Sequence, residues 1–347
     1  MENPKEVTIY DIARNLNVSP STVSRALKDD PTVSKKTRKK IFETAAQMGY
    51  RSNLFARSLR QQSSLTIGVI AFELNNSVMS SILSGIEKIA NEAGYGVIIT
   101  DSSLSAAKEA LNAENLFQRR VDGVIAALAP DSKDPDHFKP FIEKHIPLVF
   151  IDGVSGIPES TSVTIDNGMC GYIATKHLIE QGCRRIAHVT PDLRHNIYSL
   201  RYKGYLDALR ENKIPFDETL LLTAVPTEEA SEEAAKKIMD LKPLPDGVFV
   251  SNDFAAAVCI RTFLEHGIKV PGDVAVVGFN NDVIGKLITP TLSTVNFPGK
   301  EMGETAARHL VNQLKGTGNI SSISTLTIRA DLIVRQSSLK KSASGQE

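Results

Sequence analysis

The 347-residue chain contains no tryptophan, and aromatic residues make up only 6% of it. Its three cysteines, Cys170, Cys183 and Cys259, are an odd number with no Cys-x-x-Cys spacing. Such cysteines indicate reduced thiols rather than a disulfide framework or a metal site. No apolar run approaches the ~20 residues that a membrane span needs, and the polar amino terminus does not resemble a secretory signal. We therefore expect a cytoplasmic protein with no membrane association and no bound metal.

The sequence motifs of common enzymes are also missing. No Gly-x-Gly-x-x-Gly follows an expected strand, and no Gly-x-x-x-x-Gly-Lys-Ser/Thr is present. There is no His-Glu-x-x-His, no Gly-x-Ser-x-Gly and no cluster of Cys and His. The seven histidines are scattered and place no base beside a nucleophile. We expect no enzyme activity, no catalytic residue and no cofactor.

The formal net charge of zero hides an uneven distribution of charge. Residues 1–62 contain twelve Lys and Arg against six Asp and Glu, whereas the other 285 residues contain 28 against 34. A small module with a charge of +6 on a mildly acidic remainder indicates that one end of the chain binds a polyanion.

Residues 8–28 carry the pattern of two short helices joined by a tight turn. Thr8 and Asp11 form a capping box that opens a helix over residues 9–16. After a turn at residues 17–18, Ser19 is a natural N-cap and Pro20 takes the first position of a helix over about residues 20–28. So short a join makes the two helices cross steeply, as in a helix-turn-helix.

A third helix is expected between the N-cap Ser34 and Met48, with Gly49 as the left-handed residue that ends it. The apolar side chains of this region can close a small core, formed by Ile12, Ala13, Val18, Val23, Leu27, Val33, Ile41 and Phe42. The region is therefore expected to fold as a small all-α module.

At this point the sequence resembles the DNA-binding headpiece of the LacI/GalR family of bacterial transcription repressors. The resemblance is carried by residues 7–13 (VTIYDIA), 18–25 (VSPSTVSR), Val33-Ser34-x-x-Thr37-Arg38, Gly49-Tyr50 and Asn53-x-x-Ala56-Arg57-x-Leu59. The organisation of the remaining chain agrees with this family, so the resemblance covers almost the whole length.

Beyond a polar linker at residues 61–64, apolar runs alternate with amphipathic helices. Strands are expected at residues 66–72, 96–100, 122–128, 147–151, 185–190, 247–251 and 274–279. Continuous apolar strands separated by helices indicate parallel sheets that are covered on both faces. The repetition is too long for one compact unit, and Val121–Ile125 recurs weakly as Pro245–Phe249, which favours two similar lobes.

The resemblance implies a periplasmic-binding-protein-like α/β body of two doubly wound parallel-sheet lobes. We divide the chain into a helix-turn-helix headpiece (1–50), a hinge helix with linker (51–64) and an effector-binding and dimerisation domain (65–347). Lobe one is expected to hold residues 65–161 and 297–323, and lobe two residues 166–290 and 327–334. The chain would cross between the lobes near 161–165, 291–296 and 324–328. A cleft between two hinged lobes is a usual ligand site.

In a helix-turn-helix, the N-terminal side chains of the second helix enter the major groove. Arg25 can pair with guanine, which is worth ~1–3 kcal/mol of discrimination, or can contact a phosphate instead. Ser21 specifies bases weakly, and Pro20 offers an apolar contact. The expected phosphate anchors are Ser19, Thr22 and Ser24.

The resemblance also implies that a hinge helix capped by Asn53 folds on operator DNA and pairs with its twin in the minor groove. Leu59 matches the leucine wedged between base pairs, and Ala56 the small residue that faces the groove floor. The alternative is that Leu59 packs against the large domain. The hinge implies a homodimer on a pseudo-palindromic operator, and the tail lacks the leucine heptads of a tetramer.

Ligands of open α/β sheets bind beyond the carboxyl ends of the strands. The candidate effector-binding residues at those ends are Asn76, Asp101, Asp152, Asn252, Asp253 and Asn280, and the resemblance adds Arg201, at the start of an expected helix. The resemblance matches Arg201, Asp152 and the Asn252–Asp253 pair to effector contacts of the family. Each also has a structural interpretation, as a surface ion pair for Arg201, a turn cap for Asp152 and an N-cap for Asn252 or Asp253.

Two departures from the sugar-responsive members bear on the ligand. Asn280 stands where those members have Asp, and residues 76–79 (NSVM) lack the aromatic side chains that stack on a hexose. These departures favour a small polar or anionic effector over a simple sugar.

The sequence therefore predicts a DNA-binding transcription regulator, most simply a repressor, whose operator affinity is set by a small effector bound between the lobes. One alternative is a regulator whose body responds to a partner protein. A solute-binding receptor shares the body fold, but this alternative requires a signal peptide and leaves the helix-turn-helix pattern of residues 7–60 without a role.

Overall fold

The computed structural model describes residues 7–50, 63–132, 136–153, 160–317 and 324–340. The chain divides into two compact units, residues 1–64 and 65–347, which we call the headpiece and the body. The expected hinge helix, with Asn53, Ala56 and Leu59, lies outside the described residues.

The headpiece contains the three expected helices, α1 (Ile9–Leu16), α2 (Pro20–Ala26) and α3 (Lys35–Gln47). The Asp11 carboxylate accepts a hydrogen bond from the Thr8 N–H at 2.9 Å, and the Ser19 hydroxyl accepts one from the Thr22 N–H at 3.1 Å. Gly49, with φ of +68°, ends the third helix as predicted. The local capping signals of the sequence therefore set these boundaries.

The core of the headpiece differs from the prediction at one position. Phe42 is 46% exposed, so its assignment to the core was wrong. Because Ile41 and Ala45 face inward from α3, the residue after Ile41 is rotated by about 100° away from the core. The buried residues are Ile12, Ala13, Val23, Ala26, Val33, Ile41 and Ala45.

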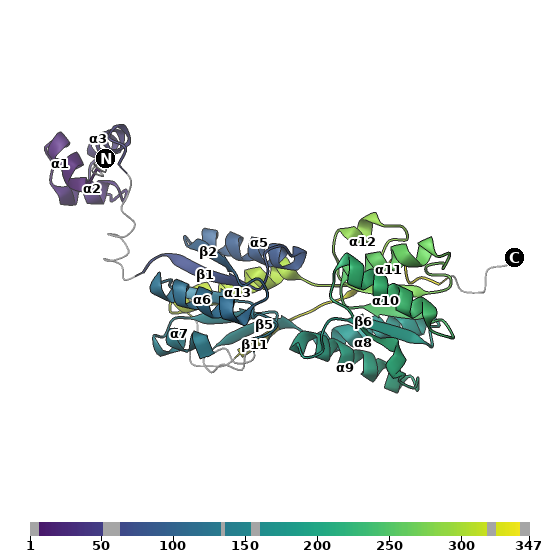
Figure 1. The fold of residues 1–347 in the computed structure, drawn as a ribbon. Helices are drawn as coiled ribbons and strands as arrows, with labels where there is room; N and C mark the ends of the chain where they lie inside the picture. Colours follow the sequence, from purple (N-terminus) through teal and green to yellow (C-terminus); the bar gives the residue numbers. More distant parts are fainter. Residues whose placement is uncertain (1–6, 51–62, 133–135, 154–159, 318–323, 341–347) are drawn as a thin grey trace, which may run out of the picture. The chain divides into compact units, whose positions relative to one another are not determined.

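Lobe one of the body is built on a parallel sheet of six strands in the order β11-β5-β4-β3-β1-β2 (Figure 1). The strands are β1 (Thr66–Ala71), β2 (Gly96–Asp101), β3 (Gly123–Ala126), β4 (Leu148–Ile151), β5 (Thr161–Ile165) and β11 (Ser324–Ile328). Helices α5 (Ser77–Glu92) and α13 (Gly299–Leu314) cover one face, and α6 (Ala106–Gln118), η1 (Asp136–Phe138) and α7 (Lys139–Glu143) cover the other. Burial on both faces explains why these strands are continuous apolar runs.

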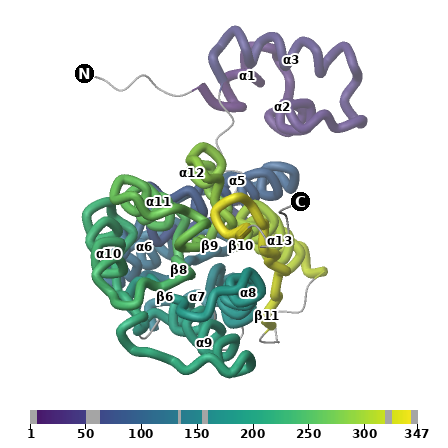
Figure 2. Tube along the Cα trace, turned by 90° about the vertical axis from the view of Figure 1, so that its right-hand side faces the viewer, coloured from purple at the N-terminus to yellow at the C-terminus, as the bar shows by residue number. Residues whose placement is uncertain are grey.

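Lobe two repeats the plan with the strand order β12-β10-β9-β8-β6-β7. The strands are β6 (Ile186–Thr190), β7 (Leu221–Thr223), β8 (Gly247–Val250), β9 (Ala275–Asn280), β10 (Ser293–Asn296) and β12 (Leu332–Ile333), and only the short β12 is antiparallel. Figure 2 shows α8 (Asn167–Glu180) and α9 (Asn196–Glu211) on one face of this sheet, and α10 (Glu228–Asp240) and α11 (Asp253–Glu265) on the other. The short helices η2 (Glu218–Leu220) and α12 (Ile284–Leu287) complete the lobe.

The three crossings between the lobes lie further along the chain than expected from the sequence. Residues 161–165 form β5 of lobe one, 293–296 form β10 of lobe two, and 324–328 form β11 of lobe one. The crossings follow these strands, so the expected lobe boundaries were wrong by up to one strand. The physical reason is that each segment completes its ladder hydrogen bonds within one sheet before it leaves for the other.

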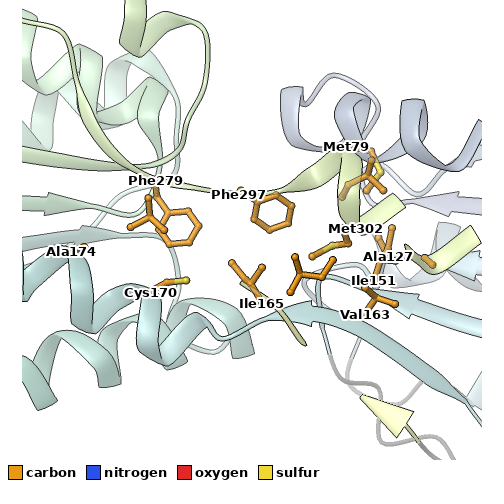
Figure 3. Close-up of a cluster of buried hydrophobic side chains, with 14 of the residues drawn as sticks. Met79, Ala127, Ile151, Val163, Ile165, Cys170, Ala174, Phe279, Phe297 and Met302 are labelled. Atoms are coloured by element: carbon orange, nitrogen blue, oxygen red, sulfur yellow. The ribbon is translucent and has the colours of Figure 1, made fainter. Parts of the chain in front are cut away.

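A continuous apolar cluster joins the lobes along the crossing segments (Figure 3). Phe279 and Cys170 belong to lobe two, and Met302 and Val163 to lobe one, while Phe297 lies between them. This shared core holds one side of the body together beside the space between the lobes.

Candidate functional site

The second helix of the headpiece presents two distinct faces. Val23 and Ala26 are buried against the headpiece core, whereas Ser21 and Arg25 are exposed. The Ser19 hydroxyl lies 2.8 Å from the hydroxyls of both Ser21 and Thr22, so these polar groups gather at the start of α2. This end of the helix is the one that a helix-turn-helix directs at base edges.

The basic side chains of α3 have different roles. Arg38 forms an ion pair with the Asp29 carboxylate and donates a hydrogen bond to the Asp29 carbonyl at 3.0 Å. Its side chain is only 17% exposed, which assigns it to the internal structure of the headpiece. Lys35 and Lys36 are exposed at the start of the helix and remain available to an anionic partner.

Within the body, a cavity of about 110 Å³ lies between the two lobes, at the carboxyl ends of their strands. Five of the seven predicted effector residues line it: Asn76, Asp152, Arg201, Asn252 and Asn280. Asn76 and Asp152 come from lobe one, and the other three from lobe two. The structure therefore brings together polar groups from segments that are far apart in the sequence.

Arg201 is the central cation of the cavity. Its Nε donates to the Asn167 side-chain oxygen at 2.8 Å, and its Nη1 donates to the Ser251 carbonyl at 3.2 Å. Its guanidinium carbon lies 3.5 Å from the centroid of the Phe279 ring. Because the residue is only 3% exposed, the alternative of a surface ion pair is wrong. These contacts hold the guanidinium in one orientation.

Asp152 faces the cavity from lobe one with an unsatisfied acceptor. Its Oδ1 is buried and has no hydrogen-bond partner among the described residues, and its backbone is left-handed with φ of +56°. Burial raises the pKa of Asp152 from 3.8 to about 6, while the Arg201 charge opposes the rise. A buried acceptor without a partner is costly, and it indicates a place where a ligand supplies a donor.

Two further cavity residues were missed by the sequence analysis. His195 Nδ1 and Ser251 Oγ are buried and have no hydrogen-bond partner within the part of the chain that the structure describes. Burial, and secondarily Arg201, lowers the pKa of His195, so its imidazole is neutral. His195 and Tyr198 precede Arg201 by six and three positions, and this helical spacing was the signal that could have identified them.

Asn76 and Asn252 combine a structural role with a place in the cavity. Asn76 Oδ1 accepts from the N–H groups of Val78 and Met79 at 3.0 and 3.2 Å, and so caps α5. Asn252 Oδ1 accepts from the Ala255 N–H at 3.1 Å and caps α11. Each cap uses the carbonyl oxygen, so the NH₂ group of each side chain is left to act as a donor.

The two remaining candidates do not line the cavity. Asp101 is engaged in a turn, where its carboxylate accepts from the Ser103 N–H at 2.8 Å. Asp253 is fully buried and accepts from the Thr294 hydroxyl and the Asp282 N–H, both at 2.7 Å. Because these carboxylates already have donors inside the protein, we assign both residues to the fold and not to a ligand.

The aromatic side chains of the cavity come from other parts of the chain than the segment considered in the sequence. Residues 76–79 indeed supply none, but Phe72, Tyr198 and Phe297 line the cavity from other elements. The lack of aromatic side chains at residues 76–79 therefore does not count against a simple sugar, because the rings that line the cavity can pack against one. Among the described residues, no helix is long and apolar enough to cross a membrane, and no group of side chains is arranged to hold a metal ion.

Two family models match the chain. The model described as bacterial regulatory proteins, lacI family, matches residues 8–53, and that of a periplasmic binding protein-like domain matches residues 175–338. Catabolite control protein A of Priestia megaterium is 32% identical over 326 residues, which cover 94% of this chain and 98% of that protein.

Solved structures agree with the sequence relatives. The lac repressor dimer bound to operator and the anti-inducer ONPF has a TM-score of 0.85 and 25% identity, covering 97% of this chain and 100% of that one. The complex of the transcriptional regulator CelR with cellobiose has a TM-score of 0.72 and 27% identity, covering 96% and 100%. The expected headpiece and two-lobed α/β body are thereby confirmed, and the chain belongs to the lacI family of bacterial regulatory proteins, which are DNA-binding regulators of transcription.

Proposed function

We propose that the protein is a homodimeric repressor whose affinity for a pseudo-palindromic operator is set by a neutral, hydroxyl-rich metabolite bound between the lobes. The observation that carries this proposal is the set of unsatisfied buried polar atoms around the cavity: Asp152 Oδ1, His195 Nδ1 and Ser251 Oγ. A carboxylate oxygen, an imidazole nitrogen and a hydroxyl beside a fixed guanidinium suit a ligand that donates and accepts several hydrogen bonds.

The charge balance of the cavity favours a neutral ligand. Asp152 and Arg201 are its one carboxylate and one guanidinium among the described lining residues, and His195 is neutral. An anionic ligand would gain from Arg201 but would be repelled by Asp152 in a region of low dielectric constant. A polyol or sugar can donate hydrogen bonds to Asp152 and accept them from Arg201. Phe72 and Tyr198 offer apolar faces to its ring.

On the DNA side, we assign base readout to Arg25, with Ser21 and Pro20 beside it, and phosphate contacts to Ser19, Thr22 and Ser24. The exposure of Ser21 and Arg25 on one face of α2 supports this assignment. The hinge roles of Asn53, Ala56 and Leu59 rest on the family resemblance alone.

The proposed mechanism is a shift between two arrangements of the lobes. One arrangement brings the two hinge segments of the dimer together on DNA, and the other separates them. Effector and operator must then alter each other's affinity by the same factor. No observation on this chain favours control by a partner protein.

The first test is a selection of random duplex DNA on the full-length protein, with Arg25→Ala and a variant lacking residues 1–62 as controls. We expect a palindrome of about 14–20 base pairs that disappears when the headpiece is deleted. Recovery of no sequence by the full-length protein, with or without added metabolites, would contradict the proposal.

The second test is a screen of neutral sugars and polyols, with cellobiose included because a relative is seen with it. The readouts are thermal stabilisation of the protein and a change in operator affinity. An effector that acts on the wild type and loses its effect in Asp152→Asn would support the assigned cavity. An anionic ligand that is unaffected by Asp152→Asn would exclude it.

A further inference from the structure

The segment that follows β9 has an unusual backbone. Asn280 and Asn281 are consecutive non-glycine residues with positive φ, +118° and +59°. Asn tolerates the left-handed region that Asn281 occupies, but φ at Asn280 lies outside that region and persists only where the surrounding structure fixes it. Asn280 lines the cavity, so this strained segment adjoins the proposed effector site.

Hydrogen bonds from two other parts of lobe two fix the segment. Arg335, after β12, donates to the Asn281 side-chain oxygen at 2.7 Å. The Asn281 NH₂ group donates to the Asn296 side chain at 2.9 Å, and its backbone N–H donates to the Thr294 hydroxyl at 3.2 Å. Asn296 ends β10, directly before a crossing between the lobes. The segment is therefore hydrogen-bonded to β10, the strand after which the chain crosses to lobe one.

The next residue, Asp282, is held from both sides. Its N–H donates to the buried carboxylate of Asp253 at 2.7 Å, which fixes it to α11. Its own carboxylate accepts a hydrogen bond from the hydroxyl of Ser77, the first residue of α5 in lobe one. The N-terminus of this 16-residue helix carries positive partial charge, which favours a carboxylate at that position. The contact directly bridges the two lobes.

Both partners of this bridge are close neighbours of cavity residues. Ser77 follows Asn76, and Asp282 follows Asn280 by two positions in a segment that its hydrogen bonds make rigid. A ligand that contacts Asn76 and Asn280 can therefore shift the two backbone segments that carry Ser77 and Asp282. Neither Ser77 nor Asp282 lines the cavity itself.

We propose that the Ser77–Asp282 hydrogen bond is an interlobe latch through which occupancy of the cavity is transmitted to the arrangement of the lobes. The inference rests on the proposed function, because it assigns the latch to the regulation of that same cavity. Asp282 acts as a positioning residue, and Asp253 and Arg335 hold the segment that carries it. The latch stabilises the lobe arrangement seen here, and a break in it shifts the balance towards the other arrangement.

The test compares full-length Ser77→Ala, Asp282→Ala and the double variant with wild type. The matched control is Ser80→Ala, because Ser80 is an exposed serine on the same helix, three positions after Ser77. Affinity is measured for the palindrome recovered by DNA selection. We expect each single variant to change the dissociation constant about fivefold in the same direction, as for the loss of one hydrogen bond. The double variant should match the single variants, because the two side chains form one interaction.

Two further measurements separate a latch from a general structural defect. Asp282→Asn keeps an oxygen that can accept from Ser77, so it should restore most of the wild-type affinity, whereas Asp282→Ala should not. Native-state hydrogen exchange, which requires no DNA, should rise in Ser77→Ala at residues 280–282 and 76–79 together. Wild-type exchange and affinity in both single variants, or additive effects in the double variant, would overturn the latch. Absence of any selected DNA site would instead count against the proposed function, and hydrogen exchange would still decide the latch.

Discussion

Replacing Asp152 with Asn should stabilise the ligand-free protein at neutral pH, although it removes a proposed ligand contact. The substitution preserves shape, and Asn tolerates the left-handed backbone at this position. Burial raises the pKa of Asp152 from 3.8 to about 6. A shift of this size corresponds to about 3 kcal/mol of unfavourable free energy for the ionised form. Because part of the side chain retains contact with solvent, we expect a gain of about 1–3 kcal/mol, or a rise in Tm of about 2–8 °C.

The pH dependence gives this prediction its specificity. A folded-state pKa above the unfolded value means that the folded protein holds the proton more tightly. The wild type therefore loses stability as pH rises from 3.8 to about 6, and the loss is complete above that range. The amide introduced by Asp152→Asn has no proton to lose, so the advantage of the variant should be full at about pH 7.5 and reduced to about a third at about pH 4.5.

The assay is calorimetric unfolding of wild type and variant at both pH values. The pKa of Asp253 is also raised to about 6, but its contribution is the same in both proteins and cancels in the difference. Asp101→Asn is the matched control, because its carboxylate already accepts from Ser103, and it should give no gain. An equal Tm for Asp152→Asn and wild type at about pH 7.5, or an equal gain at both pH values, would refute the reasoning.

Three other predictions concern the headpiece and the helix packing. Arg25→Ala should relax the preference at one base pair of each half-site by ~1–3 kcal/mol, measured by competition with single-base operator variants; unchanged preferences would refute base readout. Leu59→Ala should weaken binding to the selected palindrome more than binding to random DNA, and an equal loss on both would argue against a wedge. Gly171→Ala should lower the Tm of the body by several degrees, because a Cβ there would lie 2.0 Å from the Arg201 carbonyl oxygen of α9. Gly168→Ala, on the same helix with a nearest contact of 3.4 Å, should be nearly neutral, and equal Tm values would contradict the packing argument.

The elements that the sequence predicted well are those with local causes. The capping residues Thr8, Ser19 and Ser34 precede the three headpiece helices, as expected from short-range hydrogen bonding. The apolar runs became buried parallel strands because a strand between two layers of helices has no polar face. The weakly apolar segments at 161–165, 293–296 and 324–328 lack such a signal. These strands were expected to be crossings, because their pairing is decided by partners that are distant in the chain.

The candidate site shows the same division between features with local causes and features that depend on distant residues. Residue type and position at the end of a strand were enough to select Asp152 and Asn280, because carboxyl ends of parallel strands gather at one edge, whereas Arg201 was selected by the family resemblance. The same rule also selected Asp253, and it failed there because an internal hydroxyl and an internal N–H already satisfy that carboxylate. Ser251 carried no signal of its own and His195 only its helical spacing from Arg201, since the significance of both lies in the absence of a hydrogen-bond partner among the described residues.

The helix-turn-helix and the repeated α/β organisation could be predicted from the sequence, because they follow from capping, periodicity and spacing within short stretches of chain, and the family was recognised by resemblance. Which polar atoms are left unsatisfied in the cavity, and which side chains bridge the lobes, became visible only in the folded structure. Both properties depend on residues that are distant in the chain and belong to different lobes, such as Asp152 with Arg201 around the cavity and Ser77 bonding Asp282. Contacts of that kind are set by the packing of whole lobes, which no local pattern encodes.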